Sequence, residues 1–243
     1  MVFDIVYQDD QVIIVNKPQG MTVEPERNCG GLALTVLMKE EYGKLHAVHR
    51  LDAKTGGLTL LAKTKEAKYQ AEDAFRQNTA DSVKGYDSSS IKKIYLCQTI
   101  VRPQPPQGEL RAFLLKNPEM AKTQVFLTPT RGAHLARTVY RTIMVLDDDT
   151  ALVGVRLLTG RTHQIRAQFA YAKFPILGDD KYGNWQVNNR MRVKSQRLWA
   201  VGMVFAQLDG ALSGLSGREF WVNADFAPDL DVRAVGILKP LYS

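Results

Sequence analysis

The sequence predicts an α+β protein whose sheet is largely antiparallel. Short runs rich in β-branched and aromatic residues outnumber the helical patterns along the chain. Most of these runs follow one another through short polar connections, as strands joined by hairpins do. Strands that are followed by strands, with few helices between them, are typical of the α+β class.

The N-terminal part begins with two predicted strands, at residues 5–7 and 12–15, joined by a tight connection. A helix is predicted over residues 32–42, between glycines that open and close it. The apolar run at residues 58–62 predicts a buried strand. A second helix is predicted from the N-cap residue Thr64 to about Asn78, with alanines along one face, and a loop is predicted over residues 81–90.

The C-terminal part continues mainly with strands. A strand is predicted over residues 93–101, and two more candidates follow it. Two β-rich runs that flank an aspartate-rich turn predict an antiparallel hairpin, and a short helix follows with Ile165 and Phe169 on its inner face. The ranges are 110–115 and 124–127 for the candidates, 138–146 and 151–157 for the hairpin, 162–172 for the helix, and 198–205 and 219–222 for the last strands.

Composition favours one soluble domain over residues 1–243, with 45% hydrophobic and 23% charged residues. The net charge of +7 favours an anionic partner, of which nucleic acid is the commonest. Cys29 and Cys97 are too few for a disulfide scaffold, and we expect reduced thiols in the cytoplasm. His46 and His49 lack the partners of a zinc site. The sequence shows neither a leader pattern nor an apolar run of the roughly 20 residues that cross a bilayer.

The most informative stretch runs from His49 to Lys63. Asp52 lies there between Arg50 and a Gly-Gly pair, directly before the predicted buried strand. Cations at Arg50 and Lys54 would keep a partly buried carboxylate ionised, and such a group can act as a nucleophile or a base. An ordinary ion pair in a loop is the simpler interpretation of this stretch taken alone.

This stretch resembles the H-R-L-D-x-x-T-S-G-L-L-L-x-A-K motif of the RluA-type RNA pseudouridine synthases. Four further motifs of that family are matched in the same order and span nearly the whole chain. The matches are Asp9 to Met21 (E-D-x-x-h-x-V-x-K-P-x-G), Lys93 to Tyr95 (K-x-Y), Thr159 to Arg166 (T-G-R-x-H-Q-h-R) and Pro175 to Gly183 (P-I-x-G-D-x-x-Y-G). Two departures are Gly56, where the family has Ser, and Trp199, where the family tends to have His.

The resemblance implies the pseudouridine synthase fold, a long mixed sheet, largely antiparallel, with flanking helices and loops. It implies isomerisation of uridine in structured ribosomal or transfer RNA to pseudouridine, after the base leaves its stack. That reaction needs no cofactor and no metal. Because the first motif begins within ten residues of Met1, we expect the catalytic domain alone, without the S4-type domain of some members. We further expect a cytoplasmic monomer that does not bind to membranes.

The resemblance also implies roles for individual residues. Asp52 would be the essential carboxylate. Tyr95 would face the uracil ring, although a core tyrosine on a strand is the simpler interpretation of its position. Arg166 would pair with Asp52 and keep it anionic, although an isolated helix arginine usually lies at the surface.

Other residues are expected on the RNA side. Arg50 resembles the family arginine that enters the RNA stack when the target nucleotide leaves, because a guanidinium can stack and bond at once. Phosphate contacts are expected chiefly from the cluster between Arg190 and Arg197. The remaining expected RNA contacts are Lys17, Lys54, Arg161, His163, Gln164 and Lys181.

Two other functions fit part of these observations. A non-catalytic RNA-binding module would explain the charge, but such modules usually carry an aromatic stacking set that the sequence lacks. An N-glycosylase that acts on a nucleoside would use similar base flipping but would release the free base. The order of the motifs favours pseudouridine formation.

Overall fold

The computed structural model describes residues 4–25, 32–75, 90–231 and 236–241. Cys29, residues 76–78 of the second predicted helix and residues 81–89 of the predicted loop lie outside these ranges. The chain divides into two compact units. Unit 1 comprises Met1–Lys93 and Trp199–Ala234, and unit 2 comprises Ile94–Leu198 and Val235–Ser243.

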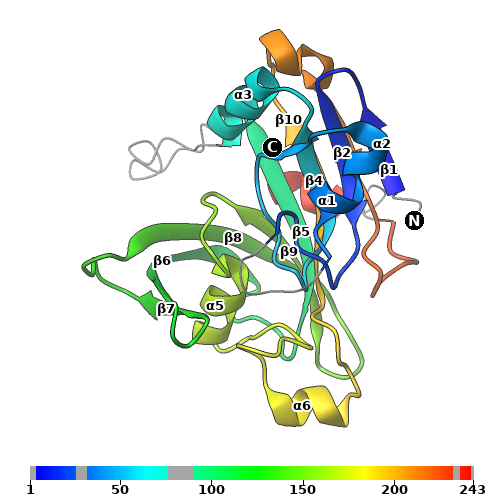
Figure 1. The fold of residues 1–243 in the computed structure, drawn as a ribbon. Helices are drawn as coiled ribbons and strands as arrows, with labels where there is room; N and C mark the ends of the chain where they lie inside the picture. The colour runs from blue at the N-terminus through cyan, green and yellow to red at the C-terminus, as the bar shows by residue number, and fades with distance from the viewer. Residues whose placement is uncertain (1–3, 26–31, 76–89, 232–235, 242–243) are drawn as a thin grey trace. The chain divides into compact units, whose positions relative to one another are not determined.

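In unit 1 the described strands pair in the order β1-β2-β4-β10, with β3 paired to β4 and β11 to β10 (Figure 1). All these pairs are antiparallel except β4 with β10, which is parallel, so the pairing is mixed. The strands are β1 (Asp4–Gln8), β2 (Val12–Lys17), β3 (His46–Ala47), β4 (Gly56–Ala62), β10 (Leu198–Phe205) and β11 (Glu219–Trp221).

The core of unit 1 lies between these strands and two helical segments, α3 (Lys65–Phe75) and the 3₁₀ turn η1 (Gly210–Leu215). Thr64 caps α3 as predicted, because its hydroxyl accepts a hydrogen bond from Ala67 N at 3.1 Å. Ala67 and Ala71 are fully buried against the apolar side chains of β2 and β4. The alanine stripe therefore allows the helix to approach the strands closely.

The helix predicted over residues 32–42 is wrong in its extent. Two single turns replace it, α1 (Leu34–Leu37) and α2 (Lys39–Tyr42). Met38, which is fully buried, separates the two turns; its φ of −82° and ψ of −8° stay in the right-handed helical region. Gly43, at φ +69°, ends the second turn as predicted.

In unit 2 the strands pair in the order β5-β9-β8-β6-β7 (Figure 1). The predicted hairpin over residues 138–157 is confirmed as the antiparallel pair of β8 and β9. The elements are β5 (Ile91–Thr99), which begins in unit 1, β6 (Gln107–Asn117), β7 (Lys122–Phe126), β8 (His134–Val145), β9 (Ala151–Leu157), α5 (Gln164–Tyr171), α6 (Trp185–Arg190) and η2 (Gly236–Leu241).

Helix α5 packs on β6, β7 and β8. An aromatic cluster joins it to β8. The rings of Tyr140, Phe169 and Phe174 lie with centroids 4.9–5.9 Å apart. Ile165 and Phe169 are buried, as predicted. Helix α6 was not predicted, because its sequence WQVNNR carries no apolar stripe. Among the described residues, no helix has the length and apolar character that a membrane crossing requires.

Candidate active site

Asp52 lies in a tight turn that ends directly before β4. Thr55 N donates to Asp52 O at 2.9 Å, and the Asp52 side chain is half-buried. Gly57, at φ +111°, follows at the start of the strand, and a Cβ there would lie 2.3 Å from Ala200 O. Only glycine fits that position, so the strand that holds the turn is closely tied to its neighbour β10.

A second loop, formed by Lys17 to Met21 after β2, holds the Asp52 turn. Gly20 N donates to Ala53 O at 2.8 Å, and Gln19 Nε2 donates to Lys54 O at 2.7 Å. The first two sequence motifs therefore meet through the main-chain carbonyl groups of the two residues that follow Asp52.

Lys17 is an internal cation of this site. Its side chain is fully buried, and Nζ donates to Pro18 O and Met21 O, each at 2.9 Å. Burial lowers the pKa of Lys17 to about 8, while the negative charge of Asp52 acts in the opposite direction. The expected phosphate contact of Lys17 is therefore corrected, because a buried ammonium does not reach RNA.

His49 supports the Asp52 turn from the core. Its Nε2 accepts a hydrogen bond from Leu60 N at 3.0 Å, and its ring lies 4.7 Å from that of Phe75. Burial, assisted by the charge of Lys93, lowers the pKa of His49 to about 3, so the ring is neutral at pH 7. The Lys93 ammonium lies 4.8 Å from the centre of the Phe75 ring, and burial lowers the pKa of Lys93 to about 8. His49 and Lys93, the first residues of their motifs, thus both contact the ring of Phe75.

The two departures from the family pattern are in contact with each other. Trp199 is opposite Gly56 in the parallel pairing of β10 with β4, and it is 1% exposed. A Cβ at position 56 would lie 2.3 Å from two atoms of the Trp199 ring. The indole Nε1 donates to Asn16 Oδ1 at 3.3 Å. Glycine is therefore required at position 56 because the tryptophan fills the space of a side chain.

Arg50 and Lys54, on either side of Asp52, are both exposed. They lie on the surface of unit 1, where a phosphate or a base can reach them. Tyr95 belongs to unit 2, where it lies on β5 and is 5% exposed. Its expected position against a uracil ring stays a prediction.

Arg166 projects from α5 and is 3% exposed. Its Nε and Nη2 donate to the two carboxylate oxygens of Asp179 at 2.8 and 2.9 Å, and Nη2 also lies 3.3 Å from Asp180 Oδ1. The alternative interpretation of Arg166 as a surface arginine is therefore wrong. Unit 2 supplies Asp179 as the partner of the guanidinium, and the expected pairing with Asp52 stays a prediction.

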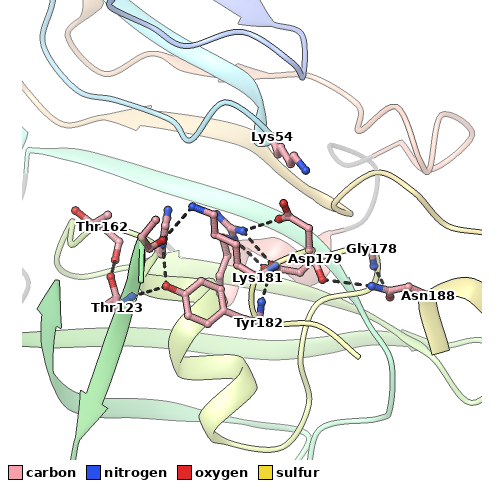
Figure 2. Close-up of polar contacts among 12 residues, drawn as sticks. Lys54, Thr123, Thr162, Gly178, Asp179, Lys181, Tyr182 and Asn188 are labelled. Carbon is pink, nitrogen blue, oxygen red and sulfur yellow. Dashed lines mark hydrogen bonds and ion pairs between the residues drawn. The ribbon is translucent and has the colours of Figure 1, made fainter. Parts of the chain in front are cut away.

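Asp179 organises the loop around this ion pair (Figure 2). Its Oδ1 also accepts from Lys181 N at 2.9 Å and from Tyr182 N at 3.0 Å. The Tyr182 hydroxyl accepts from Thr123 N at 2.6 Å and lies 2.8 Å from His163 Nδ1. Asp179 therefore joins the Arg166 guanidinium to the main chain of residues 181 and 182. The sequence held one signal for Asp179. Arg166 lies on the predicted helix that packs inward, and a buried charge needs a partner of opposite charge.

Gln164 and Arg161 bond chiefly within unit 2. Gln164 is buried, and its amide bonds to Thr159 Oγ1, to the main chain of Arg161 and Arg137, and to Thr138 Oγ1. This corrects its expected RNA contact. Arg161 is half-buried, and its Nε donates to Leu135 O at 3.2 Å. His163 is half-buried at φ +52°, and its RNA contact stays a prediction.

Comparison with known proteins bears on the same motifs. Residues 11–171 match the family model described as RNA pseudouridylate synthase. The chain is 30% identical over 190 residues to the ribosomal large subunit pseudouridine synthase C of Rickettsia conorii, with 75% of this chain and 57% of that protein covered. It is 30% identical over 182 residues to the dual-specificity RNA pseudouridine synthase RluA of Salmonella typhi, with 74% and 77% covered. The chain thus spans little more than half of the Rickettsia protein.

The fold has solved relatives. Human RNA pseudouridylate synthase domain containing 4 superposes with a TM-score of 0.67 at 23% identity, covering 90% of this chain and 88% of the human chain. Human RNA pseudouridylate synthase domain containing 1 gives a TM-score of 0.65 at 18% identity, covering 96% and 94%. At these identities the likeness establishes the pseudouridine synthase fold. Together with the family match, it shows that this chain belongs to the RNA pseudouridylate synthase family, as an RluA-type member.

Proposed function

We propose that this protein isomerises specific uridines in structured RNA to pseudouridine, with Asp52 as the essential carboxylate. The observation that carries the proposal is the construction of the Asp52 turn. The turn that carries this half-buried carboxylate is held by hydrogen bonds from a neighbouring loop to Ala53 O and Lys54 O, and the charge of the internal Lys17 acts on the carboxylate. Such support restricts where the carboxylate can lie, which catalysis at one sugar carbon requires.

The reaction breaks the C1′–N1 bond of uridine, turns the uracil and joins C5 to C1′. Asp52 would supply the anionic group at C1′, either as a nucleophile or by stabilising a glycal-forming elimination. Tyr95 would hold the uracil ring, and Arg166 would act with Asp52 from unit 2. Arg50, exposed two residues before Asp52, would fill the RNA stack that the target base leaves.

For the substrate we propose a stem-loop of ribosomal RNA, with transfer RNA as the second class. The Rickettsia relative is named for the large ribosomal subunit and the Salmonella relative for dual specificity. We propose a cytoplasmic protein that acts as a monomer. Cys97, a buried free thiol whose pKa burial raises, fits a reducing compartment.

The decisive experiment is Asp52→Asn, tested on the RNA that is identified by mapping pseudouridines in cells with and without the gene. We expect no product in a single turnover, with RNA affinity and melting temperature unchanged, because the substitution keeps the shape and removes the charge. Asp73→Asn is the matched control, since Asp73 is an exposed carboxylate on α3 of the same unit. This control should keep the wild-type rate.

Three results would contradict the proposal. A substantial single-turnover rate in Asp52→Asn would remove Asp52 from the chemistry. Release of free uracil by the wild-type protein would identify an N-glycosylase. RNA binding without any product, in the wild type as in the variant, would identify a binding module.

A further inference from the structure

Helix α6 carries the most exposed large apolar side chain of the described residues. Trp185, its first residue, is 74% exposed. Three exposed cations follow it within ten positions. We call this surface the α6 platform, and its residues are Trp185, Arg190, Arg192 and Lys194. In Figure 1 the helix lies apart from the strands of unit 2.

The platform is fixed at its base despite its exposure. Asn184 caps the helix, with Oδ1 accepting from Val187 N at 3.1 Å. Asn188 Oδ1 accepts from Gly178 N at 2.9 Å, and its Nδ2 lies 3.3 Å from Asp179 O (Figure 2). The helix that presents Trp185 is therefore bonded to the loop that holds Arg166. A ring on a fixed support loses little entropy when it binds a partner.

The surroundings of Trp185 favour nucleic acid over an apolar protein partner. Residues 184–197 contain no Asp or Glu. Gln186 and Asn189, which are exposed on the same helix, are polar, as expected of a surface that meets nucleic acid rather than an apolar partner. A single exposed ring beside several cations is the combination that binds unpaired bases, through stacking and phosphate contacts.

We propose that Trp185 stacks on an unpaired base of the RNA substrate other than the target uridine, while Arg190, Arg192 and Lys194 bind the phosphates beside it. The inference rests on the proposed function for its ligand, RNA. It adds a contact with single-stranded RNA to that function. The residues of this contact belong to unit 2 and are distant in sequence from the Asp52 turn.

The test measures the affinity of the full chain for two labelled RNAs. One is a hairpin with a seven-nucleotide unpaired loop, and the other is a blunt duplex with the same stem. Trp185→Ala should weaken binding of the loop about tenfold, in the range of one lost base stack, and leave the duplex affinity unchanged. Trp185→Phe should keep most of the affinity, because it keeps a ring.

Tyr69→Ala is the matched control. Tyr69 is 64% exposed on α3, with the Lys68 ammonium 5.9 Å from its ring centre, so it is also an exposed aromatic beside a cation. This control should bind both RNAs as the wild type does. A wild-type affinity of Trp185→Ala for the loop would overturn the proposal. An equal loss on both RNAs would also overturn it, because the effect would then not depend on unpaired bases.

The outcome is independent of the proposed chemistry. If Asp52→Asn formed product as the wild type does, the catalytic assignment would fail while the loop-specific effect of Trp185 could still be measured. If the wild type bound neither RNA, the stacking proposal itself would fall.

Discussion

At the scale of single residues, the neighbourhood of Asp52 depends on groups whose charge is set by burial. Lys17 is a fully buried cation held by two carbonyl oxygens, and His49 is a neutral ring that accepts a main-chain hydrogen bond. The sequence could place Asp52 before a buried strand, because an apolar run follows it directly. It could not place Lys17 inside, because lysines are almost never fully buried and nothing local distinguishes this one.

The neutral state of His49 predicts a pH dependence of stability. The folded protein binds the His49 proton only near pH 3, whereas the unfolded chain binds it below about 6.5. Between these values the unfolded state holds more protons, so this group makes the free energy of unfolding rise with pH by up to ~1.4 kcal/mol per unit. Above pH 6.5 its contribution is constant.

His49→Gln should remove this part of the acid sensitivity, because an amide oxygen can accept from Leu60 N without titrating. Urea unfolding of both proteins between pH 4 and pH 7 measures the difference in slope. His134→Gln is the control, since His134 is an exposed histidine on β8. A wild-type slope in His49→Gln would show that His49 is protonated in the folded protein.

At the scale of elements, most strands and the helix α5 were predictable, whereas the division of the first helix and the helix α6 were not. The hairpin of β8 and β9 follows from two β-rich runs around a turn, which are local signals. The break of the first helix at Met38 and the formation of α6 depend on packing and on the bonds of Asn188, which come from distant parts of the fold. The contact of Gly56 with Trp199 also joins residues far apart in sequence.

That contact predicts a coupled effect on stability. Gly56→Ala should cost about 1–3 kcal/mol, because the added methyl group meets the indole ring. Trp199→Leu should also destabilise, by a cavity cost of roughly 2–5 kcal/mol. In the double variant the methyl group gains room. The double variant should therefore lose less stability than the sum of the two single losses, by about 1 kcal/mol or more.

Gly202 offers a control on β10, the strand that carries Trp199. A Cβ at Gly202 would meet the ring of Trp221 rather than that of Trp199. The cycle of Gly202→Ala with Trp199→Leu should be close to additive. Denaturant unfolding of all variants measures both cycles. Additivity of the Gly56 cycle would mean that the strands shift to admit the methyl group and that the glycine is not required by the tryptophan.

At the scale of the whole molecule, the net charge of +7 does not describe the surface that the proposed RNA substrate would meet. Lys17 and Arg166 are buried and bonded within their own units, and Arg137 is paired with Glu109. Phosphate could reach only exposed cations, such as Arg50 and Lys54 in unit 1. Composition therefore predicts the sign of the partner's charge, but it does not predict which residues the partner contacts.

The salt dependence of RNA binding distinguishes a local contact from a general charge effect. Replacing Arg190, Arg192 and Lys194 by Ala should make the slope of log affinity against log salt less steep by about 2, because each lost contact to a single strand contributes roughly 0.7. The matched control replaces Lys39, Lys44 and Lys65, three exposed lysines of unit 1, and makes the same change in net charge. This control should leave the slope almost unchanged, because salt acts through the counterions released at each phosphate contact rather than through total charge. Equal changes of slope in the two triple variants would mean that net charge governs binding and that the α6 platform is no defined interface.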